Sequence, residues 1–373
     1  MPKALSTKSI AEKVVRWQKS HGRNSLPWQN TVDPYRVWLS EIMLQQTQVA
    51  TVRDYFERFT QRLPTVADLA QASPDEVMGL WSGLGYYSRA RNLHRCAQIV
   101  MQQHSGQFPR QAALLQTLPG IGRSTAAAIA SLCFGERVAI LDANVKRVLT
   151  RLLAFEGDLA QAAQERALWA LAQELVPDEN TDAKAMARYT QGMMDLGATV
   201  CLARKPLCGQ CPLQADCLAH AKERMEEFPV RTRKLKRSSQ SMWLVWAQDT
   251  NGAVWLQRRP TPGVWAGLHC LPVFDSETEL RNALPAMAQK TLQPMDTFMH
   301  VLTHKDLHIH PFYVRLVAGR RLSAMEGGWV AAKDWPALGL PAPVRKLLEA
   351  SALARGLRRE VRLAIALQFA VAL

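Results

Sequence analysis

The sequence predicts a protein of two domains, an all-α domain followed by a domain of mixed α and β structure. The chain has 373 residues, which is longer than a domain with a single hydrophobic core usually is, so two domains are expected. Between about residues 6 and 226, apolar residues recur with the period of a helix. After residue 241, short runs rich in Val, Trp, Phe and Tyr are bounded by Asn-Gly and Pro-Gly, which is typical of strands.

The charge balance indicates a polyanionic partner. Lys and Arg number 46 against 32 Asp and Glu, a formal net charge of +14. Nucleic acid is favoured over a membrane, because no apolar stretch approaches the ~20 residues of a spanning helix. A basic protein without such a partner is the alternative. Residues 1–13 lack the apolar core of a secretion signal, which predicts a cytoplasmic location.

The first helical segment with a chemical feature carries Glu41. Residues Val37 to Leu44 are apolar almost all round, so this carboxyl group is expected in surroundings of low dielectric, which raise its pKa. A glutamic acid that is protonated near neutral pH suits a general acid, above all for a purine leaving group that departs poorly as an anion. A surface glutamate on a partly exposed helix is the alternative.

Two apolar helical patterns, at residues 111–118 and 123–134, flank the sequence Leu-Pro-Gly-Ile-Gly. This pattern predicts a helix-hairpin-helix motif at residues 118–122. Its glycines let the backbone N–H groups face outward at the positive end of the second helix, where a DNA phosphate can dock without sequence readout. A plain helix–helix turn is the alternative.

Asp142 opens the next predicted helix, in the sequence Leu-Asp-Ala-Asn-Val. Asp is a favoured N-cap, so capping alone accounts for its presence. The same carboxylate, fixed in place and ionised, can also face a cationic transition state formed when a glycosidic bond breaks.

Four of the 7 cysteines lie in one short loop with the spacing C-x6-C-x2-C-x5-C. They are Cys201, Cys208, Cys211 and Cys217. Four thiolates tolerate their mutual repulsion only around a cation or a cluster, and zinc and iron-sulfur clusters both accept four cysteines. Cys96, Cys133 and Cys270 are scattered, and each is expected to be a small buried hydrophobe.

The second half begins after a basic stretch at residues 231–241, which is expected to be a linker that also touches phosphate. Strands are predicted at residues 241–248, 253–260 and 310–317, and helices at residues 283–292 and 343–356. Residues 351–373 form a C-terminal tail, whose last dozen residues are rich in Ala, Leu and Val, and no internal repeat is visible.

Five segments, together with the cysteine quartet, resemble the MutY-type adenine DNA glycosylases of the helix-hairpin-helix superfamily. They are residues 38–48, 83–93, 118–126, 141–148 and 191–201. The resemblance covers about residues 10–225. It implies a helical glycosylase domain at residues 1–230 with a 4Fe-4S cluster in the loop 201–217.

The resemblance also implies the reaction. Glu41 matches the general acid that protonates adenine at N7. Asp142 matches the aspartate that stabilises the oxocarbenium ion or bonds to it transiently, and Asn144 matches a residue that positions the nucleotide. Water completes the hydrolysis.

Chemistry on a stacked base requires that the base be flipped out, and a side chain must fill the gap. Gln46 and Tyr86 match the family's inserted residues, and Leu26 and Trp28 match the wall of the adenine pocket. Ordinary packing is the alternative for each. In the hairpin, the residues that match DNA contacts are Leu118, Gly120, Gly122 and Ser124.

Ser124 stands where endonuclease III-like enzymes carry a lysine that attacks the sugar through a Schiff base. Without that amine, the resemblance implies that water is the nucleophile and that the enzyme is monofunctional.

Residues 253–274 resemble the strand and loop pattern of a MutT-like Nudix fold, which implies a lesion-recognition domain at residues 242–350. No Nudix catalytic box with repeated glutamates follows, so Nudix hydrolysis is not expected. In MutY-type proteins this domain reads 8-oxoguanine opposite adenine. Thr303 and His304 match the recognition loop, where Leu302 replaces a phenylalanine.

The sequence therefore predicts a monomeric base-excision repair enzyme that acts on double-stranded DNA with adenine opposite 8-oxoguanine or guanine. It is expected in the cytoplasm, with the nucleoid if the source is bacterial. Two alternatives stay open: a bifunctional endonuclease III-like glycosylase and lyase, and a DNA-binding protein without catalysis.

Overall fold

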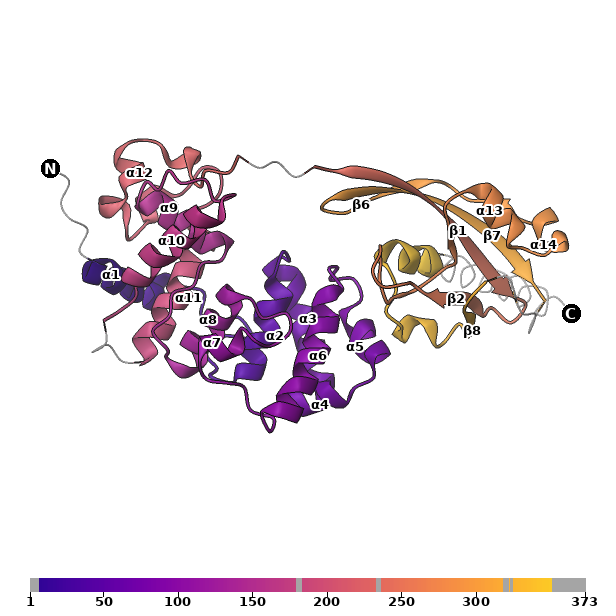
Figure 1. Cartoon of the computed structure of the whole chain (residues 1–373), viewed down its shortest axis with the longest axis horizontal. Helices are drawn as coiled ribbons and strands as arrows, with labels where there is room; N and C mark the ends of the chain where they lie inside the picture. Colours follow the sequence, from indigo (N-terminus) through magenta and orange to yellow (C-terminus); the bar gives the residue numbers. More distant parts are fainter. Residues whose placement is uncertain (1–6, 179–182, 233–235, 318–321, 323–324, 351–373) are drawn as a thin grey trace, which may run out of the picture. The chain divides into compact units, whose positions relative to one another are not determined.

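The structure is a computed structural model, and it describes residues 7–178, 183–232, 236–317, 322 and 325–350 (Figure 1). The chain divides into two compact units. The helical unit consists of Met1–Ala72 and Asn92–Lys234, and the sheet unit consists of Ser73–Arg91 and Leu235–Leu373. The predicted order of an all-α part followed by a mixed part is confirmed, but the sheet unit also takes a segment from the first half of the chain.

The helical unit is built from helices with short connections. They are α1 (Thr7–His21), α2 (Pro34–Leu44), α3 (Val49–Arg62), α4 (Val66–Gln71), most of α6 (Ser88–Gln103), α7 (Ala112–Leu115), α8 (Arg123–Phe134), α9 (Ala143–Leu152), α10 (Ala162–Glu174), α11 (Ala183–Thr199), α12 (Leu218–Ala221), and the 3-10 helices η1 (Cys208–Gln210), η2 (Gln214–Asp216) and η3 (Met225–Glu227). None of the described helices is long and apolar enough to span a membrane.

Local signals fix the start of α2 and the end of α8. Pro34 occupies the first turn of α2, where a missing N–H costs nothing, and the carboxylate of Asp33 accepts a hydrogen bond from the N–H of Tyr35 at 2.9 Å. Gly135 ends α8 in the left-handed conformation, with φ 71°.

Helix α11 is central to the core, since it packs against α1, α8 and α9. Gly192 permits the close approach to α1, because a Cβ there would lie 2.8 Å from Cγ1 of Val14. Buried apolar side chains of α1, α9, α10 and α11 form one cluster that reaches three of the four loop cysteines. This core places the start of α9 and the cysteine loop beside the same helix.

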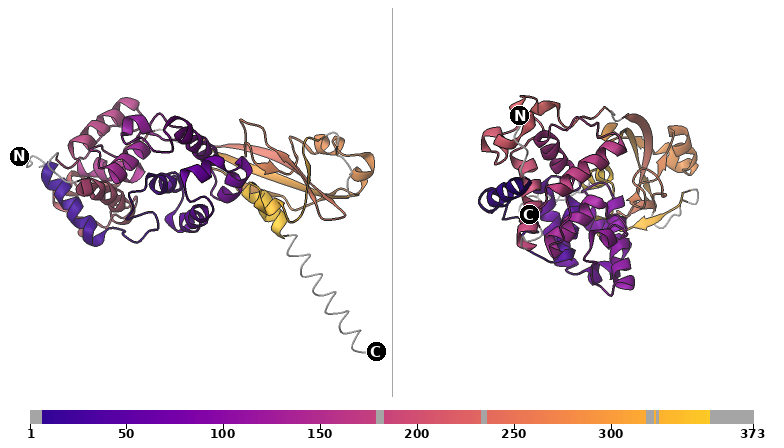
Figure 2. Two further views of the ribbon diagram at one scale, coloured as in Figure 1. Left: turned by 90° about the horizontal axis from the view of Figure 1, so that it is seen from below. Right: turned by 60° about the vertical axis from the view of Figure 1, so that its left-hand side comes forward.

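The sheet unit contains α5 (Pro74–Trp81) and one eight-stranded sheet (Figure 2). The strands are β1 (Ser238–Asp249), β2 (Val254–Arg258), β3 (His269–Cys270), β4 (Val273–Phe274), β5 (Gln293–Pro294), β6 (Phe298–Val301), β7 (Lys305–Leu316) and β8 (Gly328–Val330). The main path runs β3-β2-β1-β7-β5, with β1 and β7 parallel over their whole length from the pair Ser238 and Lys305.

Helices α13 (Glu277–Asn282) and α14 (Ala286–Lys290) pack on the sheet, and residues 342–350 are also helical. The apolar cluster under α13 and α14 includes Val245, Leu280 and Phe312. A short 3-10 helix, η4 (Trp335–Ala337), contacts α5.

Some boundaries differ from the sequence prediction. Strand β1 begins at Ser238, so the last residues of the predicted linker are paired with β7, whose backbone completes their hydrogen bonds. The helix predicted at residues 283–292 is confined to α14. Cys96 and Cys270 are buried as expected, but Cys133 is only half-buried. The predicted tail at residues 351–373 lies outside the described residues.

Candidate active site

Glu41 lies in the middle of α2, between buried neighbours such as Trp38 and Ile42, which are 0% and 3% exposed. Burial raises the pKa of Glu41 to about 7, and the negative charge of Asp142 adds to the rise. The surroundings of Glu41 therefore shift its pKa in the direction that a general acid requires.

Asp142 is the N-cap of α9, and its Oδ1 accepts a hydrogen bond from the N–H of Val145 at 2.7 Å. Burial raises the pKa of Asp142, whereas the N–H groups of Val145 and Asn144 and the cations Arg147 and Lys146 favour its charged form. The two carboxyl groups thus lie near each other, one in apolar surroundings and one among donors, which separates their roles in acid–base chemistry.

Asn144 is held by Arg147, whose guanidinium donates to Oδ1 of Asn144 at 3.0 Å. The same guanidinium donates to the carbonyls of Gly197 at 2.6 Å and Cys201 at 2.7 Å. A Cβ on Gly197 would lie 2.6 Å from Cβ of Asn144, so only glycine allows this approach. The turn that carries Asp142 is therefore tied to the first loop cysteine.

The four loop cysteines line one cavity, together with apolar residues of α9 and α11. The backbone N–H of Leu213 points to the sulfur of Cys211, and those of Ala219 and His220 point to the sulfur of Cys217. Burial raises the pKa of both thiols, and these N–H donors oppose the rise because they favour the thiolates.

Arg151, 2% exposed, supports the same loop. It donates to the carbonyls of Leu202 at 2.6 Å, Ala203 at 3.1 Å and Met225 at 2.7 Å, and its Nη1 lies 3.4 Å from the sulfur of Cys201. No three His, Cys, Asp or Glu side chains in the described residues are grouped around a position for a single metal ion. Four thiols around one cavity, with donors aimed at them, fit a cluster that takes one sulfur from each cysteine.

The hairpin has the geometry that its sequence predicts. Gly120 has φ 78°, and a Cβ there would lie 2.8 Å from Cβ of Asn92. Gly122 is the N-cap of α8 and has no heavy atom within 4 Å of a Cβ position, so its surroundings are open. The first N–H groups of α8 have no partner within the helix, which leaves them available to a phosphate.

Ser124 lies in the first turn of α8, and its buried Oγ has no hydrogen-bond partner among the described residues. Arg123 is held against the helical core, with its guanidinium 4.0 Å from the ring centre of Trp169. Leu118, at the start of the hairpin, is 3% exposed and anchors the turn in the core.

A cavity of about 610 Å³ opens in the helical unit, and its walls include Trp28, Gln29, Val37, Arg188 and Gln191. Val37 lies one turn before Glu41 on α2, so the two side chains share a face of that helix. The cavity therefore lies on the side of α2 that carries the candidate general acid.

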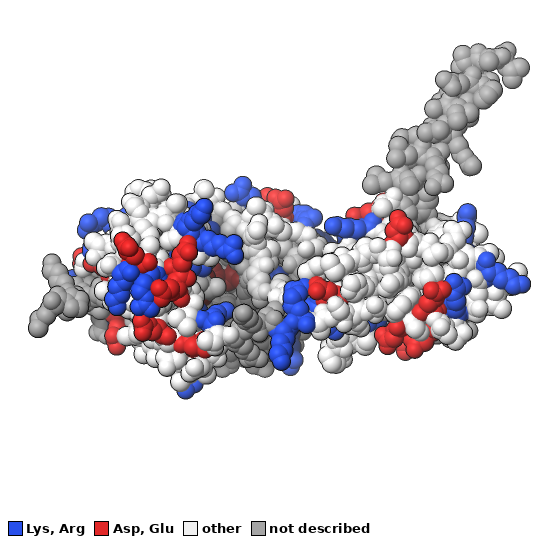
Figure 3. Space-filling model, turned by 90° about the horizontal axis from the view of Figure 1, so that it is seen from above, with Lys and Arg blue, Asp and Glu red and all other residues white. Residues whose placement is uncertain are grey.

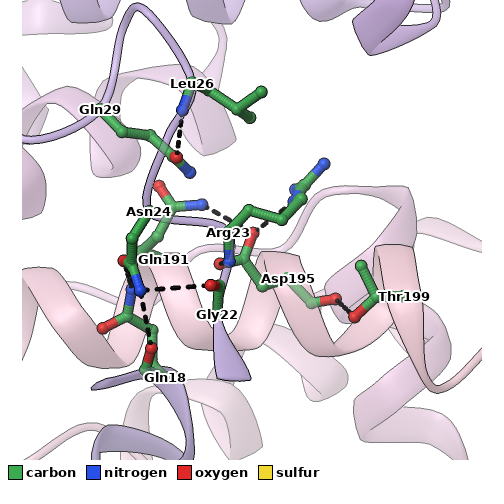
Figure 4. A network of polar contacts seen from close by, with 9 residues as sticks. All are labelled: Gln18, Gly22, Arg23, Asn24, Leu26, Gln29, Gln191, Asp195 and Thr199. Atoms are coloured by element: carbon green, nitrogen blue, oxygen red, sulfur yellow. Dashed lines mark hydrogen bonds and ion pairs between the residues drawn. The ribbon is translucent and has the colours of Figure 1, made fainter. Parts of the chain in front are cut away.

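Trp28 and Leu26 are 7% and 9% exposed. Trp28 packs edge-on against Phe56, with ring centres 5.4 Å apart, and forms part of the cavity wall. The backbone N–H of Leu26 donates to Oε1 of Gln29 at 3.1 Å and so orients a side chain of that wall (Figure 4).

The sequence analysis missed the polar part of this wall. Gln191 donates to the buried carboxylate of Asp195, which also pairs with Arg23 (Figure 4). Both Gln191 and Asp195 lie in the segment 191–201 that carries part of the family resemblance, but a glutamine in a helix gives no sign of function until its partner is known.

Gln46 and Tyr86 each have a left-handed backbone, with φ 56° and 47°. This conformation is uncommon outside glycine and costs on the order of 1–2 kcal/mol, so the surrounding structure must impose it. Gln46 follows α2 and is exposed, and Tyr86 is 41% exposed, so both side chains are accessible.

The loop that carries Tyr86 is held by Arg89. Its Nη2 donates to the carbonyls of Leu84 and Gly85, each at 3.2 Å. Its guanidinium also lies 5.3 Å from the ring centre of Trp81 and 5.4 Å from that of Tyr86. Tyr86 is thus connected through a stacked cation to a fully buried tryptophan.

In the sheet unit, Thr303 and His304 are exposed in the turn between β6 and β7. Oγ1 of Thr303 is hydrogen-bonded to the hydroxyl of Tyr86. The carbonyl of Thr303 accepts from Arg237 at 2.9 Å, and that of His304 accepts from the N–H of Ser238 at 3.1 Å. The structure therefore brings two predicted DNA-contact residues together within this unit.

Cations are interspersed with acidic side chains on the face drawn in Figure 3. Two of the described cations, Arg204 and Lys205, are exposed on the cysteine loop.

Comparisons with known proteins give concordant matches. Residues 39–177 match the HhH-GPD superfamily of base excision DNA repair proteins, residues 201–217 match the iron-sulfur binding domain of endonuclease III, and residues 242–350 match a NUDIX domain. The cysteine loop is therefore an iron-sulfur site and not a zinc site.

Similar curated proteins include the adenine DNA glycosylase of Buchnera aphidicola subsp. Acyrthosiphon pisum, which is 37% identical over 347 residues, covering 91% of this chain and 97% of the relative. The human adenine DNA glycosylase is 44% identical over 224 residues, covering 58% of this chain and 40% of the relative. Among solved structures, a thermostable thymine-DNA glycosylase matches with a TM-score of 0.51 at 28% identity, covering 58% of this chain and 97% of that chain.

Proposed function

The chain belongs to the adenine DNA glycosylases of base excision repair, and from this premise we propose that it removes adenine paired with 8-oxoguanine or guanine by hydrolysis, without lyase activity. The observation that carries the proposal is the pair of carboxyl groups, Glu41 with a pKa of about 7 beside the N-capping Asp142.

Glu41 supplies the proton. An adenine leaving group departs poorly as an anion, and protonation at N7 turns it into a neutral leaving group. A carboxyl group with a pKa of about 7 holds its proton in about half of the molecules at neutral pH and still transfers it readily.

Asp142 faces the charge that remains on the sugar when the glycosidic bond breaks. A carboxylate fixed as an N-cap pays no reorganisation cost at that moment, so it stabilises an oxocarbenium-like transition state electrostatically. Asn144, oriented by Arg147, positions the same nucleotide. Water then attacks the sugar and completes the hydrolysis.

The flipped adenine is proposed to enter the cavity walled by Trp28, Gln29 and Gln191. Gln46 and Tyr86, accessible and held in strained backbone, would fill the space that the base leaves. Thr303 and His304 would contact 8-oxoguanine on the opposite strand, together with the hydroxyl of Tyr86.

The hairpin supports hydrolysis without strand cleavage. Gly120 and Gly122 present backbone N–H groups to phosphate on a turn that Leu118 anchors in the core. Ser124 offers no amine that could form a Schiff base with the sugar. The lyase alternative therefore lacks its nucleophile at this position.

Cys201, Cys208, Cys211 and Cys217 are proposed to hold one 4Fe-4S cluster. With all four ligands from the protein, the cluster supplies a rigid anchor for the loop rather than an open coordination site. Arg151 hydrogen-bonds to carbonyls of this loop, and Arg147 hydrogen-bonds to Asn144, so both arginines would connect the anchored loop to the site. We expect a monomer that acts in the cytoplasm, at the nucleoid in a bacterial source.

The test is single-turnover release of adenine from three duplexes, with adenine opposite 8-oxoguanine, guanine or thymine. We expect the fastest release opposite 8-oxoguanine, strand cleavage only after alkali, and no trapped complex with borohydride. Glu41→Gln should abolish release, whereas Glu57→Gln, on an exposed glutamate of α3, should not change it. Tight binding with no release from any duplex would favour the DNA-binding alternative, and a borohydride-trapped complex would favour the lyase.

A further inference from the structure

Asp195 is a carboxylate with no solvent exposure, in the C-terminal half of α11. Its oxygens accept from the backbone N–H of Arg23 at 3.0 Å, from Nε of Arg23 at 2.7 Å and from Nε2 of Gln191 at 2.9 Å (Figure 4). Arg23 alone would satisfy the charge of Asp195. The third bond, to Gln191, reaches a side chain of the cavity wall.

A carboxylate can only accept hydrogen bonds, so it dictates which end of the Gln191 amide faces it. The NH₂ end must point to Asp195, and Oε1 is turned away from it. The wall around Gln191 therefore offers an acceptor whose position does not depend on the occupant of the cavity.

The amide of Gln29 is fixed in the opposite orientation to that of Gln191, with its oxygen bound and its nitrogen free. The backbone N–H of Leu26 can only donate, so it holds Oε1 of Gln29 and leaves Nε2 as the free end. That Nε2 is buried and has no hydrogen-bond partner within the described chain. The wall thus combines one oriented acceptor with one oriented donor that lacks a partner.

This polarity suits one purine. Adenine carries an amino donor at C6 beside the acceptor N1, which complements an acceptor and a donor on the wall. Hypoxanthine and guanine carry the reverse pattern, an oxygen acceptor at C6 beside an N1–H donor, and would leave like groups facing each other.

We propose that Asp195 sets the base preference of this site, because it holds the amide of Gln191 with its oxygen toward the C6 amino group of the flipped base. Asp195 touches no substrate and acts as a positioning residue. The inference rests on the proposed function, since it takes the cavity as the place of the flipped adenine.

The size of the effect follows from one hydrogen bond. A neutral hydrogen bond contributes about 0.5–1.5 kcal/mol net, and leaving a buried group unpaired costs more, so roughly 2- to 10-fold in relative rate is expected for each altered contact.

The experiment compares single-turnover excision of adenine, unsubstituted purine and hypoxanthine, each placed opposite 8-oxoguanine in the same duplex. Purine has N1 but nothing at C6, so it reports every requirement of the reaction except the contact to Gln191. Asp195→Asn releases the amide, and Gln191→Met removes its polar end with little change of volume. Thr199→Val is the matched control, because within the described part of the chain the hydroxyl of Thr199 bonds only to the backbone carbonyl of Asp195, at 2.8 Å.

Gln191→Met should lower the ratio of adenine to purine excision roughly 2- to 10-fold. Asp195→Asn should lower the same ratio and raise the ratio of hypoxanthine to adenine, because a turned amide can donate to the C6 oxygen. Thr199→Val should keep all ratios. A purely structural role for Asp195 predicts equal losses for the three bases, and that result would overturn the proposal.

If Asp195→Asn fails to fold, which thermal unfolding would reveal, Gln191→Met decides alone: an unchanged adenine to purine ratio sinks the proposal. Absence of excision by the unsubstituted protein on every duplex would instead contradict the proposed function.

Discussion

Glu41 shows how one residue can combine chemical reactivity with a cost in stability. Its carboxyl group sits in a helix whose other residues are mostly buried, and the pKa rises because the charged form loses its hydration. A neutral side chain of the same size would therefore be better tolerated at this position above neutral pH.

The pH dependence of excision follows from the protonated form of Glu41. The pKa of about 7 means that the general acid loses its proton as pH rises through 7, so the single-turnover rate should fall about tenfold per pH unit well above that value. Rates measured from pH 5.5 to 9 with adenine opposite 8-oxoguanine check this expectation. A rate that stays flat up to pH 9 would contradict the assignment.

Stability should respond to the same group with a defined sign. In the folded chain the pKa of Glu41 is raised. The resulting loss of stability is absent below the unfolded pKa near 4.5, grows between the two pKa values, and is complete above about pH 7. Glu41→Gln should therefore raise the free energy of unfolding at pH 8 by a few kcal/mol at most and change it little at pH 5. Thermal unfolding of both proteins at the two pH values is the measurement.

At the scale of an element, the hairpin before α8 depends on a single backbone conformation. Gly120 has positive φ and meets Asn92, whereas Gly122 has open surroundings. Gly120→Ala should lower the free energy of unfolding by about 1–3 kcal/mol, and Gly122→Ala should change it by less than about 1 kcal/mol. Denaturant unfolding distinguishes the two, and equal effects would contradict the argument.

Another element-level prediction concerns the loop at residues 83–87. Arg89 holds its carbonyls and stacks on Tyr86, so Arg89→Leu should allow Tyr86 to leave its strained conformation. Excision opposite 8-oxoguanine should fall roughly 2- to 10-fold. The same substitution in a Tyr86→Ala background should have a smaller effect, since the side chain that it positions is gone. Additive effects in this double-mutant cycle would exclude a role through Tyr86.

At the scale of the whole molecule, segment 73–91 is integrated into the sheet unit by many contacts. The carbonyl of Leu340 accepts from Ser82 at 3.0 Å and from Tyr87 at 3.1 Å, and Arg258 pairs with Asp75 at 2.5 Å. A Cβ on Gly339 would lie 2.6 Å from that of Met78, so this packing is close.

A chain that ends at Lys234 should therefore leave segment 73–91 without its partners. We expect faster amide hydrogen exchange in residues 73–91 than in the full chain, with α11 nearly unchanged. Preference for adenine opposite 8-oxoguanine over adenine opposite guanine should also fall, because Tyr86 loses Thr303. Equal exchange of residues 73–91 in both chains would contradict the assignment of this segment to the sheet unit.

Sequence patterns sufficed for features that are local in the chain. Helical period, the N-cap at Asp142, the glycines of the hairpin and the spacing of the cysteines each depend on a few neighbouring residues, and the structure contains all of them. The family match then identified the cysteine loop as an iron-sulfur site, which spacing alone had left open.

Features that join distant residues could not be predicted in this way. Gln191 and Asp195 are four residues apart, as a helical pair would be. The charge of Asp195 is balanced by Arg23, which lies at the other end of the helical unit's sequence. Likewise, no local pattern distinguishes segment 73–91 from the helices around it, since its partners lie about 250 residues later.

Because the chain passes between the units three times, the sheet unit cannot be exchanged as one segment in recombination or protein engineering. The backbone changes unit after Ala72, after Arg91 and after Lys234, so the sheet unit is not one continuous stretch of the gene. A chimera that takes only residues 235–373 from a relative would pair a foreign sheet with the resident Met78, Ser82 and Tyr87. Grafts of lesion specificity should therefore exchange residues 73–91 and 235–373 as one block.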